Sequence, residues 1–121
     1  MDERRALTHE FKIENKEVWL TVGEYEDGTL GEIFIRVDKE GGELRSYDGW
    51  AIACSLLLQH GIPDALETII NKFKHIHMEP SGLTNNPEIP FAKSIFDYVA
   101  KWLELRYLLA DNLDKRPDPP S

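Results

Sequence analysis

Apolar and polar residues alternate along the first third of the chain, which is the spacing of β-strands. Three runs share it, with apolar positions two residues apart: Phe11 and Ile13; Val18, Leu20 and Val22; and Ile33, Ile35 and Val37. Asn15-Lys16 and Asp27-Gly28 lie between the runs, and Asp-Gly is typical of a tight hairpin turn. We therefore predict a three-stranded antiparallel meander with one buried face, which something apolar must cover.

From Ser46 onward the apolar residues recur at helical spacing. Three stripes follow one another: Trp50, Cys54, Leu57 and Leu58; Leu66, Ile69, Ile70 and Phe73; and Phe91, Ile95, Val99, Trp102 and Leu103. Gly61 suits the end of the first helix, Pro63 the first turn of the second, and Pro90 the start of the third. The predicted fold class is α+β, a three-stranded antiparallel meander followed by three helices packed on one face.

At 121 residues the chain is long enough for one hydrophobic core and too short for two. We expect residues 1–6 to form an N-terminal arm, residues 7–109 the folded domain and residues 110–121 a flexible tail. The tail contains three prolines and cannot continue a helix. Gly41-Gly42 is expected to break the chain between the meander and the first helix.

The chain carries 22 Asp and Glu residues against 14 Lys and Arg, a formal net charge of −8. Nucleic-acid binding needs clustered basic residues that displace counterions, so we expect no nucleic-acid partner. No run of about 18 apolar residues is present, and no apolar segment follows the charged start, so we expect neither a membrane span nor a secretory signal. A single cysteine cannot form an internal disulfide, and a cytoplasmic location is the simplest interpretation.

A long loop, residues 75–90, joins the second and third predicted helices. Three prolines fix φ in it, and Gly82 permits conformations that other residues avoid. Loops longer than about 12 residues are usually functional when they are ordered. The candidate interaction loop consists of His75, His77, Glu79, Pro80, Ser81, Gly82, Thr84, Asn86 and Pro87.

Two interpretations of this loop stay open. In the structural one, Glu79, Thr84 and Asn86 satisfy buried backbone groups or cap the third helix. In the functional one, the same rigid surface meets a partner protein or a ligand, as ordered long loops often do.

The outer face of the meander offers a second candidate interface. Trp19, Tyr25 and Phe34 lie on the face opposite the aliphatic positions, and would form an apolar patch if they were exposed together. The paired carboxylates Glu24 and Glu26 are expected to be solvated.

The loop sequence His75-Ile76-His77-Met78-Glu79-Pro80-Ser81-Gly82-Leu83-Thr84-Asn85-Asn86-Pro87-Glu88-Ile89-Pro90, with the residues 91–98 that follow it, resembles a known signature. It is similar to the C-terminal region of adenosylcobalamin-dependent (class II) ribonucleotide reductases, the module often called the TSCPD domain. Residues 7–13, 20–28, 31–35 and 55–63 also resemble this module. The resemblance runs in the expected order from about Leu7 to about Tyr107.

The resemblance implies an accessory, non-catalytic module of vitamin B12-dependent ribonucleotide reductase, the enzyme class that makes DNA precursors. The implied partner is a separate catalytic subunit, on which this chain would dock as a working subunit or of which it is a remnant. Adenosylcobalamin belongs to the implied parent enzyme, and we expect no cofactor to be bound by this chain alone. The alternative is a stand-alone, self-associating small-molecule or metal-binding domain that shares the fold, so a homo-oligomer stays open.

We do not expect the chain to be active as an enzyme alone. The reduction that the resemblance implies needs a cysteine that becomes a thiyl radical and a cysteine pair that supplies electrons. Cys54 is a single thiol, and its place on an apolar stripe predicts a core residue. The large barrel of the full-length reductases has no counterpart here, and residues 110–121 contain none of the cysteines of the tail that many of them carry.

A metal site is the remaining chemical candidate. His75, His77 and Glu79 occupy alternate positions, which on a strand would face one side. No fourth ligand is evident, so polar packing is the default interpretation. His9 is expected to be a structural hydrogen-bonding residue.

Overall fold

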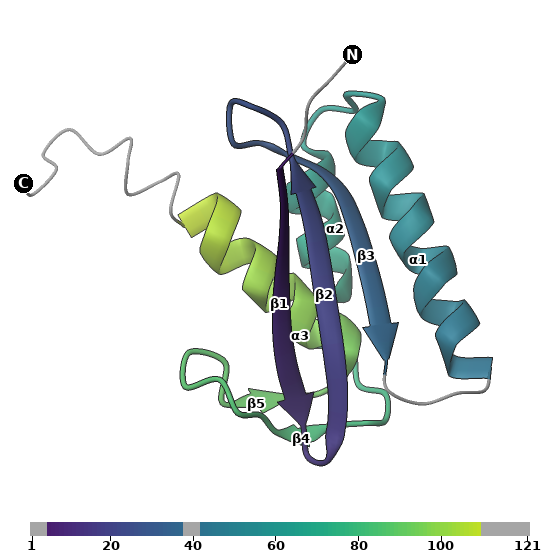
Figure 1. The fold of residues 1–121 in the computed structure, drawn as a ribbon, viewed down its shortest axis with the longest axis vertical. Coiled ribbons are helices and arrows are strands. Elements are labelled where there is room, and N and C mark those ends of the chain that lie inside the picture. Colours follow the sequence, from purple (N-terminus) through teal and green to yellow (C-terminus); the bar gives the residue numbers. More distant parts are fainter. Residues whose placement is uncertain (1–4, 38–41, 110–121) are drawn as a thin grey trace, which may run out of the picture.

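A computed structural model describes residues 5–37 and 42–109, in which helices cover one face of an antiparallel sheet (Figure 1). The predicted tail, residues 110–121, lies outside the described residues, as do most of the predicted arm and Gly41 of the predicted break. The first strand already begins at Arg5, inside the range predicted for the arm.

The sheet consists of β1 (Arg5–Ile13), β2 (Lys16–Glu24) and β3 (Leu30–Val37) in the order β1-β2-β3. Both neighbouring pairs are antiparallel, which confirms the predicted meander. Short turns join the strands at the two places where turn residues occur in the sequence.

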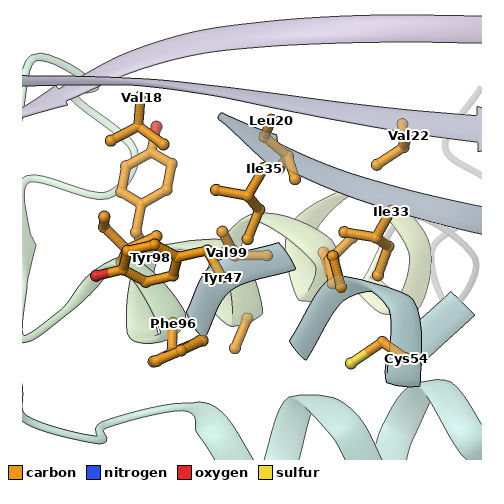
Figure 2. Packing of buried hydrophobic residues seen from close by; sticks show 14 of the residues in the cluster. Val18, Leu20, Val22, Ile33, Ile35, Tyr47, Cys54, Phe96, Tyr98 and Val99 are labelled. Atoms are coloured by element: carbon orange, nitrogen blue, oxygen red, sulfur yellow. The ribbon is translucent and has the colours of Figure 1, made fainter. Parts of the chain in front are cut away.

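The strand register brings the apolar positions of all three strands onto one face. Phe11 pairs with Val18, which pairs in turn with Val37, and all three side chains are buried. Figure 2 shows Val18 and Leu20 reaching from the sheet toward Val99 in the helical layer. The outer face of the sheet carries no helix (Figure 1).

Three helices cover this apolar face, as predicted. They are α1 (Gly42–Gln59), α2 (Ala65–Phe73) and α3 (Ile95–Leu103), and α3 continues as the wider π-helical segment η1 (Glu104–Leu109). The helix α1 packs along β3, α3 lies behind β1 and β2, and α2 packs on the other two helices (Figure 1). None of the helices in the described ranges combines the length and the apolar character that crossing a bilayer requires.

One position of the inward-facing apolar set predicted for the first helix is wrong. Leu57 is 41% exposed, whereas Tyr47, Ala51 and Cys54 are buried against the sheet and α2. The cause is that α1 carries apolar residues on both of its sides, so the sequence pattern alone does not identify the inward face.

The predicted starts of the second and third helices are also wrong. Pro63 precedes α2, because Asp64 has a left-handed backbone (φ 58°) and the helix begins after it. Pro90 does not open α3, which begins at Ile95. Ser94, four residues after Pro90, is its N-cap. Instead Phe91 belongs to the short strand β5 (Phe91–Ala92), which pairs with β4 (Gly82–Leu83), and this pairing competes with an earlier helix start.

Two leucines near the junction of α3 and η1 test the role of the core. Leu103 is fully buried and Leu105 is exposed. We expect Leu103→Ala to lower the free energy of unfolding by about 2–5 kcal/mol, since it removes buried methyl groups and leaves a cavity. Urea denaturation monitored by circular dichroism measures this. Leu105→Ala is the matched control, and an equal loss in both variants would contradict the described packing.

Candidate functional site

The loop of residues 75–90 lies across the turn between β1 and β2 (Figure 1). It contains β4, which pairs with β5 directly after the loop. The amide of Glu14 in that turn donates to the carbonyl of Leu83 at 2.8 Å, and the amide of Leu83 donates to Oε2 of Glu14 at 2.9 Å. The amide of Lys12 donates to Oδ1 of Asn85 at 2.9 Å. These contacts fix the loop on the end of the hairpin.

Gly82 is required where the loop meets this turn. It is buried, its φ is +147°, and a Cβ at its position would overlap the side chain of Glu14. Only glycine meets both conditions without strain. The sequence predicted a special backbone at Gly82, and the contact with Glu14 supplies the reason.

Thr84 and Asn86 point into the loop and hold its shape. The hydroxyl of Thr84 donates to the carbonyl of Ile89 and accepts from the amide of Asn86 at 3.1 Å. The side-chain carbonyl of Asn86 accepts from the amide of Glu88 at 2.9 Å. These two residues therefore satisfy backbone groups, but neither of them caps α3.

A row of three polar side chains joins the loop to the sheet through α3. Asn86 Nδ2 donates to the hydroxyl of Tyr98 at 2.9 Å, and that hydroxyl lies 2.8 Å from Nε2 of His9. The Tyr98 oxygen can accept from Asn86 and from one further donor, so the tautomer of His9 decides which group donates in the bond between them. Burial lowers the pKa of His9 and raises that of Tyr98 to about 12, which favours the neutral form of both groups. His9 has the hydrogen-bonding role predicted for it.

The buried carboxylate of Asp97 holds the start of the loop against α3. Its Oδ1 accepts from the amide of His75 at 2.6 Å, its Oδ2 accepts from the amide of Lys93 at 2.8 Å, and Lys101 Nζ lies 3.1 Å from Oδ2. Burial alone would raise the pKa of Asp97, but these bonds outweigh it and the pKa is lowered. The carboxylate is therefore ionised in the folded chain at neutral pH.

Sequence reasoning missed Asp97, although a signal was present. Ser94 and Asp97 stand in the S-x-x-D spacing of a capping box, which marks a helix start. Ser94 Oγ accepts from the amide of Asp97 at 2.9 Å and donates to the carbonyl of Ile76 at 2.6 Å. The same residues thus begin α3 and fix the loop.

The remaining candidate residues face outward. His75, His77, Glu79 and Pro87 are exposed, and the hydroxyl of Ser81 lies 3.5 Å from Nε2 of His77. Pro80 is half-buried. These side chains take no part in the hydrogen bonds described above, although Nδ1 of His75 lies 4.0 Å from Oδ1 of Asp97.

The structure does not bring the metal candidates together. His75 has a left-handed backbone (φ 75°) and residues 75–79 are not a strand, so the alternation that was expected to align His75, His77 and Glu79 is absent. Within residues 5–37 and 42–109, no three His, Cys, Asp or Glu side chains form a group that could hold a metal ion.

The loop also presents an exposed apolar pair that the sequence analysis did not select. Leu83 of β4 and Phe91 of β5 are direct cross-strand partners, so their side chains lie on the same face. They are 66% and 46% exposed. Met78 is a third exposed apolar residue of the loop. We call Leu83 and Phe91 the loop pair.

The predicted aromatic patch on the outer sheet face is interrupted. The guanidinium of Arg36 lies 4.4 Å above the ring of Trp19. The ring of Tyr25 packs against Gly31, where a Cβ would approach it to 2.6 Å. Phe34 alone of the three predicted aromatics is exposed.

Glu24 is buried, which corrects the prediction that it is solvated. It continues the alternation of Val18, Leu20 and Val22 and so lies on the covered face, where its carboxylate accepts from Arg106 Nε at 2.9 Å and from the Tyr107 hydroxyl at 2.6 Å. Arg5 reaches the other carboxylate oxygen at 3.2 Å. Burial opposes ionisation, but these partners outweigh it and lower the pKa of Glu24. The group borders a cleft of about 440 Å³.

Cys54 is buried in the core, as predicted. Burial raises the pKa of its thiol to about 12, so the reactive thiolate form is not populated at neutral pH.

The TSCPD domain family matches residues 1–107 of the chain. The chain is also similar to several vitamin B12-dependent ribonucleotide reductases. That of Rhodopirellula baltica is 44% identical over 108 residues, which cover 88% of this chain and 10% of the reductase. That of Bradyrhizobium diazoefficiens is 42% identical over 109 residues, 88% of this chain and 8% of the reductase.

The reductase of Streptantibioticus cattleyicolor is 39% identical over 106 residues, which cover 87% of this chain and 17% of the reductase. The chain therefore spans between 8% and 17% of the length of these three relatives. No solved structure matches it.

Replacing Asp97 tests whether its carboxylate holds the loop. We expect Asp97→Asn to lower the free energy of unfolding at neutral pH by on the order of 3 kcal/mol. The two oxygens of the ionised carboxylate accept from two backbone N–H groups, whereas the neutral asparagine side chain has a single acceptor oxygen. The folded pKa is below the ordinary value of 3.8, so the wild-type advantage is fully present above that value and is lost as the pH falls through the folded pKa.

Urea denaturation of both proteins at about pH 7 and about pH 3 measures the difference. Asp27→Asn is the matched control, because that carboxylate is fully exposed and bonds only within its own turn. A wild-type advantage that stayed constant down to the acid value would show that the Asp97 charge is not its source.

Proposed function

The chain belongs to the TSCPD domain family, as its sequence resemblance predicted, and we propose that it is an accessory, non-catalytic module of vitamin B12-dependent ribonucleotide reduction. In this proposal it docks on a separate catalytic subunit in the cytoplasm and contributes to the synthesis of DNA precursors. The relatives named above are reductases, and their similarity to this chain is confined to a small part of their length.

The state of the single thiol supports a non-catalytic role. A reduction that leaves a disulfide consumes two thiols, and this chain has one cysteine. Cys54 is buried and its pKa is raised to about 12, so it is not poised to react. The radical and dithiol chemistry would therefore be carried out by the partner subunit, which would also bind adenosylcobalamin.

The observation that carries the docking proposal is the loop pair. Leu83 and Phe91 expose apolar surface on a loop that is held rigidly from beneath by Asp97 and Asn86. Apolar side chains on a preorganised loop lose little conformational entropy when a partner covers them. The exposed His75, His77 and Glu79 would form the polar rim of such an interface.

Charged replacements of the loop pair test this surface. We expect the double variant Leu83→Asp/Phe91→Asp to stop co-purifying with the vitamin B12-dependent catalytic subunit of the same organism, because the interface would bury two carboxylates. Its melting temperature should stay close to that of the wild type, since both side chains are exposed. Affinity purification and a reductase assay with added chain measure binding and effect.

The matched control is Phe34→Asp, which changes an exposed aromatic residue on the outer sheet face. It should leave binding unchanged. Loss of binding in Phe34→Asp alone would show that the interface lies on the outer sheet face and not at the loop pair. A wild-type chain that neither binds the subunit nor alters its activity would contradict the accessory role.

The cleft beside Glu24 favours one second candidate, a small-molecule binding domain that shares the fold. Arg5 and Arg106 line this cleft and could meet an anionic ligand such as a nucleotide. A ligand that binds only the folded chain raises its melting temperature. On this candidate, nucleoside diphosphates or triphosphates raise the melting temperature of the wild type, and raise that of Arg5→Ala less. An unchanged melting temperature removes the candidate.

A further inference from the structure

The outward face of α1 is apolar, although no part of the described chain covers it. Exposed residues follow two i, i+4 rows of this face and end at His60, just past the helix: Asp48, Gly49, Ile52, Ala53, Leu56, Leu57 and His60. Ile52 and Leu56 are 57% and 50% exposed. We call this set the α1 stripe. Between its two ends it contains no charged residue.

The contrast with α2 shows that this composition is unusual for the chain. The exposed face of α2 carries Glu67, Thr68, Asn71 and Lys72, the polar set expected of a solvated helix. Charged residues make up 30% of the whole sequence, yet the centre of the α1 stripe has none. A helix that is apolar on both sides is typical of one that is covered on both sides.

We propose that a second copy of this chain covers the α1 stripe, with the two α1 helices packed antiparallel about a two-fold axis near Ala53. The ends of the stripe carry a carboxylate at Asp48 and an imidazole at His60, whose Nδ1 donates to the carbonyl of Leu56 at 2.8 Å, so the protonated ring has its Nε2–H left to donate to a carboxylate. Antiparallel packing brings each Asp48 toward His60 of the second copy, whereas parallel packing would bring two Asp48 carboxylates together. The stripe is therefore complementary to itself in one orientation, as a two-fold interface requires.

Size and charge along the stripe agree with this arrangement. Gly49 and Ala53 occupy one row and allow close approach of the helix backbones, while Ile52 and Leu56 form the adjacent ridge. Packing of i, i+4 ridges between helices is the commonest class in globular proteins. Two copies that each carry a net charge of −8 repel one another, and a contact through the uncharged centre keeps their acidic residues apart.

The α1 stripe and the loop pair are separate surfaces. In Figure 1 the C-terminal half of α1 lies at the end of the molecule opposite β4 and β5. Self-association through α1 is therefore compatible with docking through the loop and does not depend on it.

Sedimentation velocity over a concentration series tests the proposal. The wild-type chain is expected to approach twice its 13.9 kDa mass, and Ile52→Glu/Leu56→Glu to remain at 13.9 kDa with an unchanged circular dichroism spectrum. The matched control Thr68→Glu places the same side chain on the exposed face of α2 and should sediment as the wild type does. A wild-type chain that stays at 13.9 kDa throughout, or a double variant that still dimerises, overturns the proposal.

Cross-linking tests the proposed two-fold axis near Ala53 without a variant that breaks the interface. Ala53→Cys is expected to give a covalent dimer with a short bis-maleimide, because position 53 would lie beside its own counterpart. The native Cys54 is buried and should not compete. Asn71→Cys, on the exposed face of α2, should give no covalent dimer. Cross-linking at position 71 and not at position 53 would contradict the proposed interface.

Discussion

The constraint on which the structure depends is the single apolar face of a three-stranded sheet. A sheet this small buries too little by itself, so its stability comes from the helical layer that covers it. Phe11 and Tyr98 illustrate the coupling, because their rings stack 3.7 Å apart between β1 and α3. The position of α3 is thereby set by the sheet, and everything attached to the start of α3 is set with it.

The loop of residues 75–90 takes its shape from that attachment. Asp97 and Ser94 begin α3 and at the same time hold the backbone of the loop, while Glu14 holds its other side. The buried carboxylate of Asp97 thus links the start of α3 to the loop whose exposed residue Leu83 lies 14 residues earlier in the chain. The structural and functional interpretations of the loop are consequently not exclusive, since its inner residues fix it and its outer residues stay exposed.

Sequence periodicity predicted the meander, the number of helices and their common side, because burial of one face imposes a regular spacing. It failed where two interactions competed locally. At Pro90 and Phe91 helical propensity lost to pairing between β4 and β5. At Glu24 the two-residue spacing directs the side chain inward, whereas its charge favours solvent, and the spacing prevailed. The sequence pattern did not single out Leu83, because a single apolar residue in a loop has no periodicity. Its exposure depends on which surfaces the rest of the chain covers, and the pattern does not contain that information.

The internal pairing of charges fixes the protonation states of the buried ionisable groups. Asp97 and Glu24, the buried carboxylates, are each held ionised by several donors, and the Cys54 thiol is held protonated. General acids and bases work best with pKa values near the working pH, and the pKa values of these three groups are shifted away from neutrality. Within residues 5–37 and 42–109 the side-chain polar atom that is buried without a partner is the indole nitrogen of Trp50, which is a donor only. The polar groups of the interior are thus largely paired among themselves, and the large apolar side chains that stay exposed include the loop pair and Ile52 and Leu56 of α1.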